Sequence, residues 1–322
     1  MVADPPPEKR GGVPTLLIKL ALSATLVVWL LSEIDLGAAR ALVAAADPLP
    51  LALGVALLAL STAVSGLRWQ IIVRALGGRL GITDSLRLSF VGLFFNQFLP
   101  SSFGGDAFRA IGLYRVGLSP RLAVTGTLLD RVAALIGIIL FVLVFLPVTP
   151  DLREGLHRWL VPLLALLLLV GVAGLELFVR LPEGWRRWKP VQALADFAAD
   201  ARHVFLRPAP SAAALACALA CQLLMTLSFV AFADALGLAV PVFPFFALVP
   251  LIMLASVLPV SIAGWGVREA AAVFGFGLIG VAREPALVMA MSFGLGCLIV
   301  SLPGGWLWMA LLHRSPPGDT AP

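Results

Sequence analysis

Two short segments of the sequence repeat one pattern of helix-breaking and charged residues. The first is NQFLPSSFGGDAFRA, residues 96–110, and the second is SVLPVSIAGWGVREA, residues 256–270. Both fit the frame Leu-Pro-x-Ser-x-x-Gly-x-x-x-Arg, which ends at Arg109 in the first copy and at Arg268 in the second. Arginine suits bidentate binding of phosphate, and a helix N-terminus beside serine and glycine also attracts anions. The repeated pattern therefore indicates anion binding at two broken helices.

Proline and glycine explain why each helix should break, and serine explains how the next one begins. Proline removes a backbone donor and stops a helix, whereas glycine permits sharp turns and close approach. We expect the hairpin tips to be formed by Pro100, Gly104, Gly105, Pro259, Gly264 and Gly266. Serine and aspartate cap helix N-termini. The expected caps are Ser102 and Ser261, with Asp106 as a further cap in the first copy.

The two motif arginines lie one turn into the second arm of each broken segment. A guanidinium group in hydrocarbon is costly and is usually functional. We expect Arg109 and Arg268 to hold a phosphorylated lipid head group from opposite leaflets, together with the amides at the tips. The alternative is that each arginine ties its own hairpin to a nearby group, with Asp106 and Glu269 as partners.

A second pair of charges, Asp130 and Arg131, falls inside a long apolar segment. At ~1.5 Å per residue, Asp130 lies roughly 13 Å beyond Arg121, close to mid-bilayer. Adjacent helical residues point about 100° apart, so the two should find different partners. We expect one to reach Arg109 or Asp106 and the other to reach Glu269 or substrate, the alternative being a salt bridge that only supports packing. In the same register, the second copy has Met289 and Ala290.

The composition excludes a soluble protein. Hydrophobic residues make up 60% of the 322 residues and charged residues only 13%, whereas soluble domains carry about 25% charged residues. The net charge of +5 comes from basic residues clustered in loops, which is typical of cytoplasmic loops and not of nucleic-acid binding. Three cysteines and three histidines show no disulfide, zinc or metal spacing. We therefore expect no catalytic residues, no metal and no cofactor, and the sequence contains no ATP-binding G-x-x-x-x-G-K-[ST] pattern.

Apolar runs of about 20 residues predict the helices that carry these motifs. We predict six full crossings, at residues 14–31, 49–73, 122–145, 160–179, 212–236 and 286–312. The motif segments at 84–116 and 243–280 have arms of about a dozen residues, short of the ~17 that a crossing needs, so they are predicted to be re-entrant hairpins. The predicted class is an all-α polytopic membrane protein with inverted-topology repeats.

Charge placement predicts the topology and the domain boundaries. Basic residues before the first span and after the second, fourth and last spans put both termini in the cytoplasm. That count includes Arg68, Arg74, Arg79 and Arg87 after the second span. One membrane domain is predicted over 14–313, with repeats at about 49–147 and 211–312 and an amphipathic connector at 181–210 on the inner leaflet. Residues 1–13 and 314–322 are predicted to be disordered tails.

The segments FNQFLPSSFGGDAFRAIGLYRVGLSPRLAVTGTLLDRVAAL and LPVSIAGWGVREAA resemble the membrane-domain family of lysylphosphatidylglycerol synthase/flippases, including hopanoid-associated members. The resemblance implies a bacterial inner-membrane protein that handles lipids between leaflets. The positions that the resemblance carries over are Pro100, Ser102, Gly105, Asp106, Arg109, Asp130, Arg131, Pro259, Gly264, Gly266, Arg268 and Glu269. Two departures stand out: no aminoacyl-transferring domain follows the last span, and Trp265 is bulky for its place at the second tip.

Three classes of function are compatible with these features. The leading one is a transporter or flippase for a membrane lipid with an anionic or zwitterionic head group, with a homo-oligomer or a lipid-synthesis enzyme as partner. The second is a membrane-embedded enzyme of lipid or glycolipid metabolism, and the third is an accessory scaffold for envelope lipid synthesis. The sequence offers no His–Asp set or paired carboxylates for the second, and a scaffold has no need of charges inside the membrane.

Overall fold

The computed structural model describes residues 35–99, 104–149, 152, 157–257 and 263–312, and its regular elements there are α-helices. They are α2 (Leu36–Ala44), α3 (Pro48–Ala75), α4 (Ile82–Phe98), α5 (Gly104–Arg115), α6 (Pro120–Phe145), α7 (His157–Val179), α8 (Glu183–Arg186), α9 (Lys189–Phe205), α10 (Pro208–Ala235), α11 (Phe245–Val257), α12 (Val267–Gly277) and α13 (Arg283–Leu312). The predicted all-α class is confirmed in this part of the chain.

Five of the described helices, α3, α6, α7, α10 and α13, are long and apolar enough to cross a membrane. They coincide with five of the six predicted crossings, so the chain is a multi-pass membrane protein. The sixth prediction, at 14–31, lies outside the described residues, as do the two predicted terminal tails. Helix α7 has only 6% of its most apolar window buried inside the protein, and its leucine-rich surface is therefore left for lipid.

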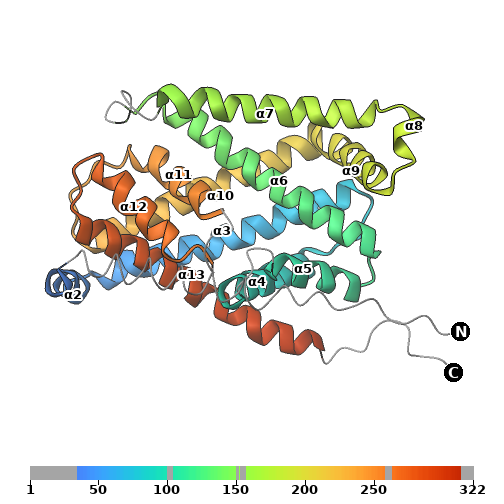
Figure 1. The fold of residues 1–322 in the computed structure, drawn as a ribbon. Coiled ribbons are helices and arrows are strands. Elements are labelled where there is room, and N and C mark those ends of the chain that lie inside the picture. Colours follow the sequence, from blue (N-terminus) through green and yellow to red (C-terminus); the bar gives the residue numbers. More distant parts are fainter. Residues whose placement is uncertain (1–34, 100–103, 150–151, 153–156, 258–262, 313–322) are drawn as a thin grey trace, which may run out of the picture.

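Helices α3 and α10 form the centre of the fold and run antiparallel (Figure 1). Each has 28 residues and begins with proline at its first turn, where the missing N–H costs nothing. Each is followed by a glycine with positive φ, Gly77 at 87° and Gly237 at 66°, the conformation that ends many helices. The two helices approach closely at Gly54, whose carbonyl accepts a 3.0 Å hydrogen bond from Ser228.

The two motif segments are helix–break–helix units that lie toward opposite ends of the long helices (Figure 1). The first consists of α4 and α5, which pack on each other. The second consists of α11 and α12, which also pack on each other. Their arms have 17, 12, 13 and 11 residues. Helix α4 begins at Ile82, with Asp84 and Arg87 in its first two turns, and its 17 residues exceed the predicted dozen and reach the ~17 that a crossing needs.

The remaining long helices enclose these units. Helix α6 packs on α10 and α11, and α13 packs on α3 and α4. The predicted amphipathic connector contains α8 and α9. The buried face of α9 carries Ala195, Ala198, Ala201 and Val204, whereas Trp185, Trp188 and Leu194 are exposed. Both tryptophans, which precede α9, therefore point away from the protein, as interfacial anchors do.

Candidate polar cavity

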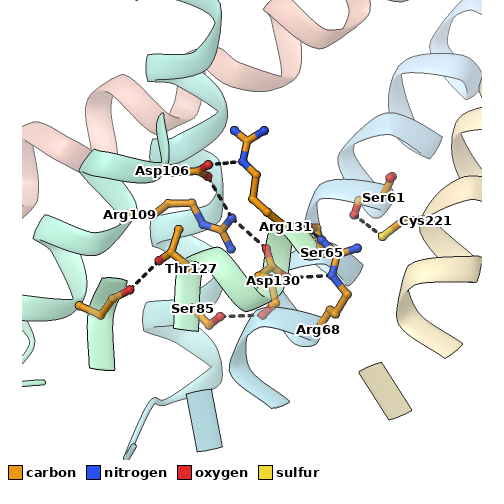
Figure 2. Close-up of polar contacts among 12 residues, drawn as sticks. Ser61, Ser65, Arg68, Ser85, Asp106, Arg109, Thr127, Asp130, Arg131 and Cys221 are labelled. Carbon is orange, nitrogen blue, oxygen red and sulfur yellow. Dashed lines mark hydrogen bonds and ion pairs between the residues drawn. The ribbon is translucent and has the colours of Figure 1, made fainter. Parts of the chain in front are cut away.

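The charged residues inside the helices meet in one buried cluster (Figure 2). Asp130 of α6 accepts a 2.7 Å hydrogen bond from Nε of Arg68 on α3 and a 3.0 Å bond from Nη1 of Arg109 on α5. The three residues are 2%, 5% and 8% exposed. A carboxylate this far from water is tolerable because cations pair with both of its oxygens.

Arg131 and Asp106 extend the cluster toward its edge. Arg131 pairs with Asp106, which also lies 3.7 Å from Nη1 of Arg109. Figure 2 shows the Arg131 side chain turned toward Asp106 and away from the neighbouring Asp130. The expectation that these neighbours take different partners is confirmed. Asp130 reaches Arg109 and Arg131 reaches Asp106, whereas Glu269 pairs with Arg268.

Arg109 is only partly satisfied by these pairs. Its Nε and Nη2 atoms are buried and have no hydrogen-bond partner among the described residues. These two atoms form one edge of the guanidinium group, the edge that can hold two oxygens of a carboxylate or phosphate. The ring of Trp69 lies 4.0 Å from the guanidinium carbon and fixes the plane of the group through a cation–π contact.

Arg268 occupies the matching place in the second motif but has a different environment. Its Nε and Nη2 atoms donate to Glu269 Oε1 at 3.0 and 2.5 Å. The guanidinium carbon also lies 4.9 Å from the Trp265 ring and 5.7 Å from the Phe293 ring. The bulky Trp265 thus has a packing role, and Arg268 pairs with Glu269, as in the alternative to head-group binding.

A cavity of about 380 Å³ separates the two motif segments. Its polar wall is formed by residues of α3, α4, α5, α6, α10 and α11: Ser61, Thr62, Ser65, Arg68, Ser89, Asn96, Gln97, Arg109, Arg131, Gln222 and Ser256. Gly264 from the second tip also lines it, whereas Arg268 and Glu269 are not among its lining residues. The structure therefore brings Arg109 and Arg131, but not Arg268, to one polar space.

The backbone at the tips is partly as the sequence predicts. Gly264 and Gly266 have φ values of 80° and 86°, which glycine adopts without strain. Gly104 and Gly105 are helical instead; a Cβ on Gly105 would overlap the carbonyl oxygen of Gly92, so close packing requires this glycine. The predicted tip and cap residues Pro100, Ser102, Pro259 and Ser261 lie outside the described residues.

The described amides at the tips already have protein partners. Gly105 N donates to Asn96 Oδ1 at 2.9 Å, and Gly266 N donates to Glu269 Oε2 at 2.6 Å. We expected free helix N-termini to bind the anion. For these two amides that expectation is wrong, because the side chains of Asn96 and Glu269 already accept their hydrogen bonds.

Sequence reasoning missed Arg68, which it counted as a basic residue of the inner side. The residue lies two turns before the end of the 28-residue helix α3, and its burial depends on the facing Asp130. The sequence feature that could have identified it is an arginine inside an apolar helix, because charged residues at such positions usually have a function. Among the residues that the structure describes, no group of three His, Cys, Asp or Glu side chains could hold a metal.

A second, apolar hollow of about 790 Å³ lies between α6 and α9. Its wall contains Val124, Leu128, Val132, Leu135, Leu194 and Phe197, with Arg121, Asp196 and Asp200 among its polar residues. Arg131, Ala134, Ile138 and Val257 line both hollows. The polar cavity and this α6–α9 groove therefore adjoin along one face of α6.

The family model for the lysylphosphatidylglycerol synthase TM region matches residues 16–306. The matched range contains both motif segments and the whole wall of the polar cavity. No curated protein matches the chain.

Proposed function

This chain belongs to the family of the lysylphosphatidylglycerol synthase TM region, and from that premise we propose that it moves a polar-headed lipid between the leaflets of the membrane. Membership indicates a lipid-related function in the membrane. The observation that carries the finer proposal is the polar cavity of about 380 Å³ between the two broken segments. Such a cavity offers a lipid head group a path through a layer that otherwise excludes it.

The wall of the cavity supports a role for bound polar groups. Buried polar atoms normally have hydrogen-bond partners. Four other lining residues carry buried oxygens without a partner among the described residues, in addition to the empty edge of Arg109: Ser61, Ser89, Gln97 and Gln222. Leaving such groups unsatisfied costs about 1–3 kcal/mol each. A polar ligand or water that enters the cavity would recover this free energy.

We infer that the domain is built from inverted repeats, with α3 to α6 related to α10 to α13. Helices α3 and α10 are equal in length, and each begins with Pro-x-Pro and is followed by Leu-Gly. The turns after α5 and α12 again contain glycines with positive φ, Gly117 at 92° and Gly280 at 81°. These correspondences extend the repeat well beyond the motif.

The packing of the helices supports the same relation. The inferred relation pairs α6 with α13 and α11 with α4, so the contact of α6 with α11 should have a counterpart in the contact of α13 with α4. Both contacts exist. Likewise, α6 packs on α10 as α13 packs on α3. Cys221 Sγ donates to the Ser61 carbonyl at 3.5 Å across 160 positions of sequence, which is the displacement from Pro48 to Pro208. The inferred two-fold axis therefore passes near this contact, beside the cavity.

This symmetry gives each motif segment a place in the membrane. We propose that α4 and α5 enter from the cytoplasmic side and α11 and α12 from the opposite side of a bacterial inner membrane. On the first side, Arg74 and Arg115 lie at the ends of α3 and α5, and Arg79 lies in the loop between α3 and α4, in agreement with the excess of basic residues in cytoplasmic loops. Substrate sites of transporters with inverted repeats lie near the midplane, between discontinuous helices.

Transport is also favoured over chemistry. The described residues that line the cavity include no histidine and no carboxylate. A hydrolase or transferase would need a general base or a nucleophile within reach of the lipid. The wall can bind and release a head group, and among its described residues the hydroxyls and the Cys221 thiol have no histidine or carboxylate beside them in the lining to take a proton.

Leaflet exchange in vesicles tests the proposal. The full chain is reconstituted with fluorescent tail-labelled lipids, and a membrane-impermeant quencher reports exchange. Thr62→Trp should fill the cavity and reduce exchange to the rate of protein-free vesicles, whereas Leu60→Trp on the exposed side of α3 should not. Formation of a lipid product without exchange would point to an enzyme, and neither activity would point to a scaffold; either result overturns the proposal.

A further inference from the structure

We infer that the cavity selects an anionic lipid whose phosphodiester head group also carries hydroxyl groups, and that it rejects a cationic aminoacylated head group. This inference rests on the proposed function and names its substrate class. Three features carry it: the empty edge of Arg109, the charge of the cavity wall, and the groove that adjoins it.

The two motif arginines identify the missing ligand group. On Arg268, the Nε–Nη2 edge holds an oxygen of Glu269. On Arg109, the same edge has no partner among the described residues, although it is buried beside the cavity. Asp130 and Asp106 approach only Nη1 of Arg109. The vacant edge therefore matches an anion with two oxygens in one plane, which a phosphodiester supplies.

The charge of the wall decides the sign of the ligand. Its described lining residues include three arginines, Arg68, Arg109 and Arg131, and no carboxylate. Asp130 and Asp106 lie behind these arginines and pair with them, and the three arginines and two aspartates together carry a formal charge of +1. An added ammonium group would meet only like charge in a medium where such repulsion is weakly screened.

The neutral part of the wall indicates hydroxyl groups. Gln97 and Gln222 each have a buried side-chain oxygen without a donor, and Ser61 and Ser89 have hydroxyls without partners. An amide oxygen can only accept a hydrogen bond, so its partner must carry an N–H or O–H group. A quaternary ammonium such as choline has no N–H or O–H to give, whereas a polyol can donate to the amides and accept from the serines.

The α6–α9 groove favours a lipid over a soluble phosphate ester. Its wall is mostly aliphatic and aromatic, and it shares Arg131, Ala134, Ile138 and Val257 with the polar cavity. A molecule with its phosphate on Arg109 can therefore place an acyl chain along α6 without leaving protein surface. We assign the groove to the chains of the same lipid.

Three tail-labelled probes with the same chains test the selectivity: phosphatidylglycerol, phosphatidylcholine and lysyl-phosphatidylglycerol. The full chain is reconstituted in phosphatidylcholine vesicles, and exchange is measured for each probe. We expect phosphatidylglycerol to exchange faster than the other two by at least about tenfold, the factor given by 1.4 kcal/mol of discrimination. Arg109→Gln should remove this preference. Arg109→Lys keeps a positive charge beside Asp130 but lacks the Nε–Nη2 edge. This variant should still fold but lose most of the preference for phosphatidylglycerol.

The outcomes separate this inference from the proposed function. Equal rates for all probes, or a preference for the lysyl lipid, would overturn the selectivity while exchange itself stands. If no lipid exchanges, binding of the three probes to the protein in detergent is measured. A preference for phosphatidylglycerol that Arg109→Lys abolishes would then uphold the selectivity and refute transport. Displacement of the lipid by soluble glycerol 3-phosphate at equal concentration would show that the chains contribute nothing and would overturn the inference.

Discussion

Arg68 and Asp130 join α3 to α6 through a 2.7 Å ion pair that is almost completely buried. The other oxygen of Asp130 holds Arg109 of α5 at 3.0 Å. One carboxylate thus connects the long helix α3, the second arm α5 of the first broken segment and the helix α6 that follows. Asp130 fixes the position of Arg109, and with it the position of the cavity wall.

Replacing Asp130 by Asn should destabilise the protein strongly. The change leaves Arg68 and Arg109 buried without a counter-charge, and loss of one member of a buried pair costs about 3–5 kcal/mol. Arg68→Met should be costly for the converse reason. The double variant should lose less than the sum of the two single variants because the charge and its partner leave together. Thermal unfolding in detergent gives these differences, and additive losses would show that the pair is not coupled.

The control for this cycle is Asp234→Asn. Asp234 lies in α10, the other long central helix, but its side chain is exposed. Removing this charge should change the free energy of unfolding by less than about 0.5 kcal/mol, as is usual at surface positions.

Replacing Glu269 by Gln tests whether Arg268 is structural, in contrast to Arg109, which we propose binds the lipid. The amide keeps an oxygen for the Gly266 N–H but removes the charge from Arg268, which is 4% exposed. We expect a loss of stability of about 3 kcal/mol. Because Arg268 and Glu269 do not line the cavity, exchange per folded molecule should match that of the unchanged protein. If a folded Glu269→Gln variant lost lipid exchange, that result would show that Arg268 is part of the substrate site.

The sequence was sufficient for the elements that depend on local chemistry. Long apolar runs predicted α3, α6, α7, α10 and α13, and the Pro- and Gly-containing motif predicted the breaks after α4 and α11. The pairing of Arg268 with Glu269 could also be anticipated, because the two are neighbours beside the second tip. Their exclusion from the cavity could not, since it depends on which way α12 turns against α13.

Other features depend on how distant helices pack. Arg68 is polar and lies near a basic segment, so only the facing Asp130 identifies it as part of the site. The predicted match of Asp130 with Met289 also changes. If Gly117 corresponds to Gly280, Asp130 corresponds to Phe293, whose ring lies 5.7 Å from the Arg268 guanidinium carbon. The extra turn that shifts this register lies after the motif, where the sequence has no marker.

Gly105→Ala should weaken the contact between α4 and α5. A Cβ at this position would overlap the Gly92 carbonyl oxygen, so the two arms must separate. Overpacking of this kind typically costs about 1–3 kcal/mol. Gly171→Ala in α7 is the matched control, because nothing lies within 4 Å of its added Cβ, and alanine is favoured over glycine inside a helix. A lower unfolding temperature for Gly105→Ala alone is expected; equal temperatures would contradict the close approach.

Filling the α6–α9 groove should slow lipid exchange without touching the charges. Leu128 and Leu135 line this groove but not the polar cavity. We expect Leu135→Trp to reduce exchange by about tenfold or more, since an acyl chain denied apolar surface loses roughly 0.8 kcal/mol per CH₂ group. Leu169→Trp on the exposed face of α7 adds the same ring where lipid already surrounds the helix and should have no effect. Equal rates in the two variants would mean that the chains travel elsewhere.

The proposal that the two broken segments enter the membrane from opposite sides can be tested with single cysteines. Tyr114 ends the first segment and Leu278 follows the second, and both side chains are exposed. After replacement of Cys217, Cys221 and Cys297, a membrane-impermeant thiol reagent should label Tyr114→Cys only from the cytoplasmic side and Leu278→Cys only from the other side. Inverted repeats require this difference, because the axis near Ser61 and Cys221 exchanges the two faces of the membrane. Labelling of both positions from one side would rule out the two-fold relation and leave the cavity without an entrance from each leaflet.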